Sequence, residues 1–186
     1  MDKIEEKIIN IIEENKEEIK AFARDIEAHP EPGFCERRTA AQVAKAFRGL
    51  GLHTKEQLAV TGVRGSLSKK EGAELTILGE MDAIGCRNHQ KADKENGTAH
   101  ACGHHAQLAA MLGAAMALSD EEVRASLHGN VSFLAVPAEE YIDIKKERRF
   151  RKRELVFRLQ ERASLFVQES LTAQILCLRH TYIWFL

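Results

Sequence analysis

The sequence is poor in several residue types that mark particular protein classes. Its 186 residues include three prolines, four cysteines and one tryptophan, and aromatic residues make up 6%. The low proline content excludes a collagen-like or proline-rich chain, and four irregularly spaced cysteines are too few for a small disulfide scaffold. No apolar run reaches the roughly 18 residues that a membrane-spanning helix needs. We therefore expect no membrane partner.

What is present is typical of a globular protein, with 44% hydrophobic residues, 30% charged residues and a formal net charge of −1. A balance so close to zero argues against a general nucleic-acid-binding protein. The acidic start, residues 1–6, lacks the apolar core of a secretory signal peptide. We therefore expect a cytoplasmic location, where cysteines stay reduced.

Charge is distributed unevenly along the chain. Residues 1–144 hold 17 Lys and Arg against 24 Asp and Glu, a balance of −7, whereas residues 145–186 hold 10 against 4, a balance of +6. Residues 138–186 also contain neither glycine nor proline. Such a shift in composition indicates a boundary. We expect a first domain over residues 1–144 and a basic, apolar tail over residues 145–186 that is helical if ordered.

Hydrophobic periodicity predicts alternating helices and strands before that boundary. Isoleucines recur at helical spacing near the start of the chain until Pro30 and Pro32 interrupt the pattern. The expected helices cover residues 3–28, 36–50 and 104–118, the expected strands cover 58–60, 63–67, 73–79 and 130–136, and a loop covers 86–99. Such alternation is typical of a layered α/β domain.

Two carboxylates follow the expected strand 73–79. Glu80 and Asp82 are two residues apart, so their side chains project to the same side if the strand continues. The carboxyl ends of strands are where open α/β sheets hold their ligands. A solvated acidic turn would give the same pattern, and both interpretations stay open here.

Residues 100–105, His-Ala-Cys-Gly-His-His, precede a helix rich in small residues. Imidazole and thiolate are preferred ligands of zinc and similar metal ions. A single glycine separates Cys102 from His104, which permits a tight turn toward a shared ion. The alternative is a surface loop with incidental histidines, or a reactive cysteine near the start of a helix.

A third group, Pro137-Ala138-Glu139-Glu140, comes directly after the expected strand 130–136. Adjacent ionised carboxylates repel each other, which an active site can use if one binds a metal and the other moves a proton. An ordinary acidic turn is again the alternative. Together, the three groups supply the carboxylates, imidazole and thiol of a metal-assisted hydrolase.

The order and spacing of these motifs resemble the N-terminal part of the M20 family of metallopeptidases, in the amidohydrolase branch that cleaves N-acyl amino acids and similar amides. The resemblance runs from about residue 3 to residue 144. It rests on residues 29–34 with Glu36, and on residues 79–83, 100–104 and 136–140. It implies a three-layer αβα zinc-peptidase-like catalytic domain, present here incompletely, and an N-acyl amino acid or small peptide as substrate.

The resemblance also implies residue roles. Cys102, His104 and Glu140 would be metal ligands. Glu139 would be the general base that takes a proton from a metal-bound water and later returns it to the leaving nitrogen. Asp82 would assist catalysis by orienting the ligands. The family normally uses two divalent ions, often manganese, zinc or cobalt.

The sequence departs from the family in two respects. His105 stands where this branch often has Asp, and we expect it to point elsewhere. Beyond residue 144, the family's dimerisation domain, further ligand histidines and remaining catalytic sheet are not recognisable. We therefore expect no family-like dimer, leave the oligomeric state open, and expect weak or no activity from the truncated chain. We hypothesise that residues from about 145 onward are an out-of-frame or otherwise replaced reading of the missing region.

Two other functions stay open. One is a non-catalytic metal-binding or interaction fragment that keeps the first half of this fold. The other, with less support, is a thiol-dependent redox or transferase protein that uses Cys102.

Overall fold

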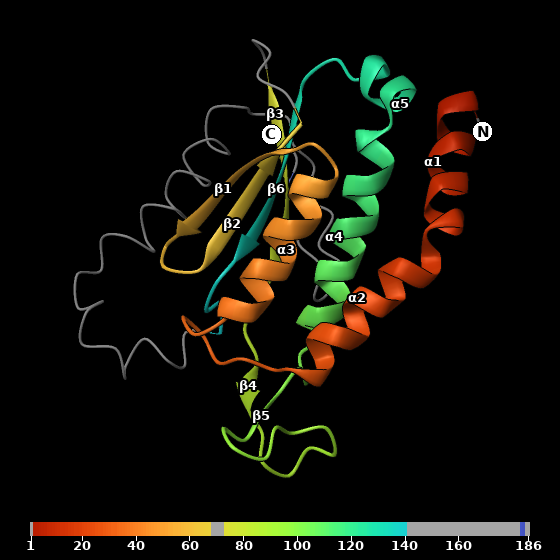
Figure 1. The fold of residues 1–186 in the computed structure, drawn as a ribbon. Helices are drawn as coiled ribbons and strands as arrows, with labels where there is room; N and C mark the ends of the chain where they lie inside the picture. Colours follow the sequence, from red (N-terminus) through yellow and green to blue (C-terminus); the bar gives the residue numbers. More distant parts are fainter. Residues whose placement is uncertain (1, 68–72, 141–182, 185–186) are drawn as a thin grey trace.

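The computed structural model describes residues 2–67, 73–140 and 183–184, and Figure 1 shows their arrangement. The helices are α1 (Lys3–Glu14), α2 (Lys16–Ala28), α3 (Arg37–Gly49), α4 (His104–Ser119) and α5 (Glu121–Ser126). The strands are β1 (His53–Leu58), β2 (Gly62–Ser66), β3 (Glu74–Glu80), β4 (Ile84–Gly85), β5 (Thr98–Ala99), β6 (Asn130–Val136) and β7 (Ile183–Trp184). The tail predicted over residues 145–186 lies outside the described residues except for β7.

A five-stranded sheet in the order β1-β2-β6-β3-β7 forms the centre of the fold, and β4 pairs separately with β5. β3 and β6 run parallel along their full length, from Glu74 opposite Asn130 to Glu80 opposite Val136. The other neighbours in this sheet are antiparallel. Because β3 and β6 end side by side, the segments that follow them start from adjacent points at one edge of the sheet.

Helices α3 and α4 cover one face of the sheet (Figure 1). Phe47 of α3 meets Phe133 of β6 with ring centroids 6.0 Å apart. Glycines allow this close approach, because a Cβ on Gly65 would lie 2.7 Å from the Phe47 ring, and a Cβ on Gly79 would lie 3.0 Å from Leu108 of α4. Helices α1 and α2 pack in turn on α4. The result confirms the predicted mixed α/β class, and the described residues supply the sheet and one of the two expected helical layers.

Five elements agree with the sequence prediction to within one residue at each end, namely α3, α4, β2, β3 and β6. The helix expected over residues 3–28 is instead divided at Asn15, where the Asn15 side-chain amide donates a hydrogen bond to the carbonyl oxygen of Ile11 at 2.8 Å. Asparagine competes in this way with the helical hydrogen-bond pattern, which explains the break.

The prediction of a strand over residues 58–60 was wrong. The chain turns there with positive φ at Ala59 and Val60, and the strand β1 precedes the turn. Four of the six residues of β1 are exposed, because it is an edge strand of the sheet. An edge strand of this kind lacks the apolar alternation that reveals a strand in a sequence.

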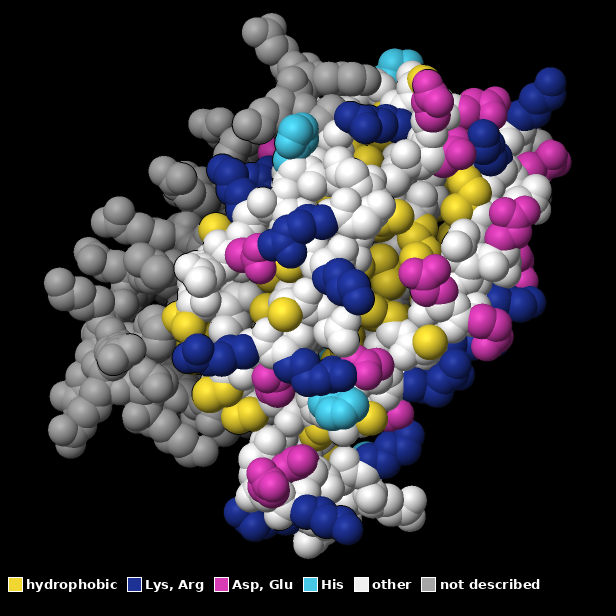
Figure 2. Space-filling model, viewed as in Figure 1, with side chains coloured by type: hydrophobic (Ala, Val, Ile, Leu, Met, Phe, Trp, Pro, Cys, Tyr) yellow, Lys and Arg dark blue, Asp and Glu magenta, His cyan; other side chains and the backbone are white. Residues whose placement is uncertain are grey.

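Lysine and arginine side chains lie among acidic side chains on the face seen in Figure 2. Within the described ranges, the structure contains no helix that is both long and apolar enough to cross a bilayer.

The packing of α3 over β2 predicts the effect of enlarging Gly65. A Gly65→Ala substitution would force the new methyl group to within 2.7 Å of Phe47 and 2.9 Å of Leu52. We expect a loss of about 1–3 kcal/mol in the free energy of unfolding, measured by urea denaturation. The control is Gly49→Ala at the exposed end of α3, where nothing lies within 4 Å. It should be neutral or stabilise by up to about 1 kcal/mol. Equal midpoints for the two variants would contradict this packing.

Candidate metal centre

His104 is the first residue of α4 and lies at the centre of the site. The preceding Gly103 has φ +91°, a conformation that glycine adopts without strain, and the chain turns there into the helix. The imidazole is buried. Its Nδ1 donates to the backbone oxygen of Asp82 at 2.7 Å, and its Nε2 lies 2.9 Å from a carboxylate oxygen of Glu80. Both ring nitrogens therefore face acceptors.

These contacts favour the protonated imidazole. Burial alone would lower the pKa of His104, but the hydrogen bonds to Asp82 and Glu80 outweigh it and raise the pKa to about 10. The ring therefore carries a positive charge at neutral pH in the metal-free protein, and that charge balances part of the surrounding acidity.

Two further carboxylates reach His104 from the turn after β6. An oxygen of Glu139 lies 3.9 Å from Nε2 of His104, and an oxygen of Glu140 lies 3.8 Å from the same nitrogen. Both glutamates are half-buried. The adjacent ends of β3 and β6 thus bring the two acidic motifs together around a single imidazole.

Potential ligand atoms gather in two overlapping groups. Cys102, His104 and Glu140 form one group, and Glu80, His104 and Glu139 form the other. Within each group the ligand atoms all lie within 4.8 Å of one another. A thiol, an imidazole and carboxylates are a donor set that suits zinc and other borderline divalent ions.

Asp82 is buried beneath this cluster and holds its parts together. Its Oδ2 accepts a hydrogen bond from the backbone N–H of Glu140 at 3.1 Å, while its Oδ1 lies 3.4 Å from Nδ1 of His104. Burial tends to raise the pKa of Asp82, but the bond to His104 and the amide of Glu140 lower it overall. Asp82 therefore stays ionised. Its Oδ1 is buried, and among the described residues its polar contact is this ion pair with His104.

The acidic surroundings shift the pKa of two other groups. Partial burial and the neighbouring Glu140 carboxylate raise the pKa of the Cys102 thiol to about 12, although the residue as a whole is exposed. Burial and the charges of Glu80 and Glu140 raise the pKa of Glu139. A thiol in this setting is protonated until a cation displaces the proton, and a glutamate with a raised pKa is a better proton acceptor.

The structure therefore brings together all five residues named from the sequence: Asp82, Cys102, His104, Glu139 and Glu140. His105 points elsewhere, with its Nε2 3.7 Å from Glu27. The buried His100 belongs to neither ligand group, and its ring stacks at a tilt 5.6 Å from that of His105.

Two residues acquire importance that the sequence analysis did not give them. Glu80, one of the two carboxylates of its motif, makes the shortest carboxylate contact to Nε2 of His104, whereas the family resemblance had implied a role only for Asp82. Gln107 accepts a hydrogen bond from the backbone N–H of Glu80 at 2.6 Å and so fixes the end of β3. Its position three residues after His104, on the same face of a helix, was the available signal.

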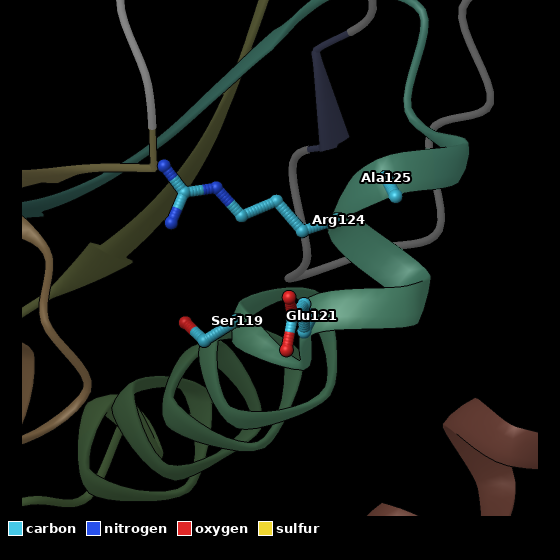
Figure 3. A pocket seen from close by; sticks show the side chains of 4 residues that line it. All are labelled: Ser119, Glu121, Arg124 and Ala125. Atoms are coloured by element: carbon cyan, nitrogen blue, oxygen red, sulfur yellow. The ribbon is translucent and has the colours of Figure 1, made fainter.

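A shallow hollow of about 440 Å³ lies at the junction of α4 and α5, lined by Ser119, Glu121, Arg124 and Ala125 (Figure 3). Ser119 ends α4, so it is about 22 Å along the helix from His104. This hollow is therefore separate from the candidate metal centre.

Comparisons with known proteins found several similar proteins. Residues 76–148 match the sequence model of "Peptidase family M20/M25/M40". The chain is 41% identical over 122 residues to a protein of Synechocystis sp. named "Probable hydrolase". The aligned region covers 63% of this chain and 30% of that protein. It is 32% identical over 139 residues to the N-acyl-L-amino acid amidohydrolase of Geobacillus stearothermophilus. This aligned region covers 73% of this chain and 37% of that enzyme.

A solved structure supports the fold. A dinuclear metal-binding peptidase of the M20 family from Bacillus subtilis superposes with a TM-score of 0.58 at 31% identity, over 66% of this chain and 35% of that one. The resemblance predicted from the sequence is thus confirmed. The chain spans about a third of the length of the curated relatives it matches.

The raised pKa of Cys102 predicts slow alkylation of the metal-free protein. With a pKa of about 12, roughly one thiol in 10⁴ is ionised at pH 8, so the rate with iodoacetamide should rise about tenfold per pH unit from pH 7 to 10 without a plateau. Glu140→Gln removes the neighbouring negative charge and should speed the reaction several-fold.

Peptide-resolved mass spectrometry measures this reaction, with Cys86 as the internal reference. Glu121→Gln, which changes a carboxylate on α5, should leave the rate at Cys102 unaltered. A plateau below pH 9 would show that the thiol is not suppressed in this way.

Proposed function

We propose that this chain, whose residues 76–148 match the M20 peptidases, carries the N-terminal part of a metal-dependent hydrolase that cleaves the amide bond of N-acyl amino acids or small peptides. The observation that carries the proposal is the convergence of Cys102, His104 and Glu140, whose ligand atoms lie within 4.8 Å of one another. The relatives named above include an amidohydrolase of N-acyl-L-amino acids, which supports the substrate class.

In this proposal, Cys102, His104 and Glu140 hold a divalent ion, which we expect to be manganese, zinc or cobalt. Nδ1 of His104 is engaged by the backbone oxygen of Asp82, which leaves Nε2 as the ligand atom. A metal-binding histidine commonly donates its other ring N–H to a carbonyl or carboxylate in this way. Asp82 therefore orients the imidazole and, through the amide of Glu140, a second ligand.

Bound at this place, a divalent ion would polarise the scissile carbonyl group and lower the pKa of water. Glu139 lies beside the ligands with a raised pKa and is the proposed general base. It takes the proton of the attacking water and returns it to the leaving nitrogen, so one carboxylate serves both half-reactions.

Both ligand groups use His104, and only its Nε2 is available. The described residues therefore suit one ion at a time, and a family-like pair of ions would need additional ligands. This is why we expect weak turnover from the chain on its own. A non-catalytic metal-binding protein is the second candidate, favoured by the single imidazole nitrogen that both ligand groups share. The cytoplasmic location and the absence of a family-like dimer stay predictions.

Substitution of the proposed ligands separates metal binding from catalysis. Cys102→Ala and His104→Ala should each weaken binding of Co²⁺ or Zn²⁺ by at least about 100-fold, because loss of even an orienting partner costs 10–100-fold. Isothermal titration calorimetry and metal content of the purified chain measure this. Cys86→Ala and His89→Ala, in the loop after β4, are the matched controls and should bind as the unchanged chain does.

Glu139→Gln should retain the metal yet lower hydrolysis of an N-acetyl amino acid by about 10²–10⁴-fold, since it removes the proton acceptor. Unchanged turnover in this variant would refute the role of Glu139. Tight metal binding without any turnover in the unchanged chain would instead support the non-catalytic metal-binding protein.

A further inference from the structure

Glu36 is a buried carboxylate that the reaction described above does not use. It immediately precedes α3 and is fully buried, with an exposed fraction of 0%. Burying a carboxylate is costly unless its oxygens find partners. Those partners therefore indicate what the side chain contributes.

The two oxygens of Glu36 join segments that are far apart in the sequence. The hydroxyl of Thr61, in the turn between β1 and β2, donates to Oε2 at 2.6 Å. The backbone N–H of Ala138 donates to Oε1 at 2.8 Å, across 102 residues. Glu36 thus ties the start of α3 to the turn that follows β6.

Glu36 does not serve as the cap of its own helix. It stands at the N-cap position of α3 but makes no side-chain capping hydrogen bond. Glu31 performs that function instead, since its carboxylate accepts the backbone N–H groups of Arg38 and Thr39 at 2.9 and 2.8 Å. The carboxylate of Glu36 is therefore left to bind Thr61 and the turn after β6.

That turn has an unfavourable backbone conformation. Ala138 is buried and has φ +51°, in the left-handed region that residues with a Cβ rarely adopt. Such a conformation persists only where surrounding contacts hold it. Glu36 binds the amide of Ala138, and Asp82 binds the amide of Glu140 two residues later. Glu139 lies between these two fixed amides.

We propose that Glu36 is a positioning residue of the candidate metal centre: by holding the amide of Ala138 it fixes the turn from which Glu139 and Glu140 reach His104. The inference rests on the proposed function, because it assigns Glu36 to the geometry of the same site. Glu36 belongs to neither ligand group. It acts through the backbone of residues 138–140.

The test uses the full chain and compares Glu36→Ala with Glu36→Gln and Thr61→Val. Alanine removes the hydrogen bonds to Thr61 and Ala138. Glutamine keeps an oxygen that can accept from Ala138, and Thr61→Val removes only the bond to Thr61, which does not involve the turn after β6. Co²⁺ is the probe, and its thiolate charge-transfer absorption reports ligation by Cys102. We expect Glu36→Ala to weaken Co²⁺ binding by about 10–100-fold, with Glu36→Gln and Thr61→Val close to the unchanged chain.

A second readout needs no metal. Hydrogen exchange at the Ala138 amide should accelerate on the order of tenfold or more in Glu36→Ala and much less in Thr61→Val. Urea unfolding of each variant identifies general destabilisation, which Thr61→Val should share without losing the metal. Should Glu36→Ala fail to fold, Glu36→Asp takes its place, since it keeps the charge but withdraws the carboxylate by one methylene.

The outcomes separate this inference from the proposed function. If the unchanged chain binds no Co²⁺, both are overturned. If it binds Co²⁺ and Glu36→Ala, or Glu36→Asp in its place, binds equally well, only the role of Glu36 is overturned. The same holds if Thr61→Val loses as much affinity as the Glu36 variant, because the loss would then follow stability.

Discussion

The concentration of negative charge around one imidazole is the constraint on which the candidate site depends. Glu80, Asp82, Glu139 and Glu140 all place an oxygen within 4 Å of a ring nitrogen of His104. At an effective dielectric constant of 20, two unit charges 4 Å apart interact by about 4 kcal/mol, so such a cluster requires compensating positive charge. In the metal-free protein the His104 imidazolium supplies part of it, with a pKa of about 10. A divalent ion would supply more.

The parallel pairing of β3 with β6 is what creates this concentration. Its register places Glu80 opposite Val136, so the segment with Asp82 and the turn with Glu139 and Glu140 leave the sheet side by side. The helix α4 connects the two strands across one face and presents His104 at its first turn. The amide of Glu140 on Asp82 and the amide of Ala138 on Glu36 then fix the turn. Each of these two hydrogen bonds is accepted by a buried carboxylate, so the acidic side chains of this region serve both the structure and the proposed ligand binding.

Local patterns made β6, α3 and α4 predictable, because each combines strong periodicity with a clear end signal. The five proposed site residues could also be identified from the sequence, since each follows a recognisable strand or lies at the start of a recognisable helix. The division at Asn15 and the edge strand β1 were not, because they depend on a single side-chain hydrogen bond and on tertiary pairing of an exposed, mostly polar segment. The role of Glu36 was likewise hidden, because its partner Ala138 is 102 residues away.

The same acidity bears on the choice between a metal centre and a thiol nucleophile at Cys102. A nucleophilic cysteine needs a lowered pKa, which positive neighbours or a helix N-terminus provide. Here partial burial opposes ionisation, and so do the carboxylates of Glu140, Asp82 and Glu139, and together they raise the pKa of Cys102 to about 12. A nearby helix start does not overcome them. The thiol becomes a thiolate only when a cation shares the site, because metal binding displaces the proton. The carboxylates that would disable Cys102 as a free nucleophile are those that make it useful as a ligand, so the charge pattern favours metal-dependent chemistry over the thiol-dependent alternative.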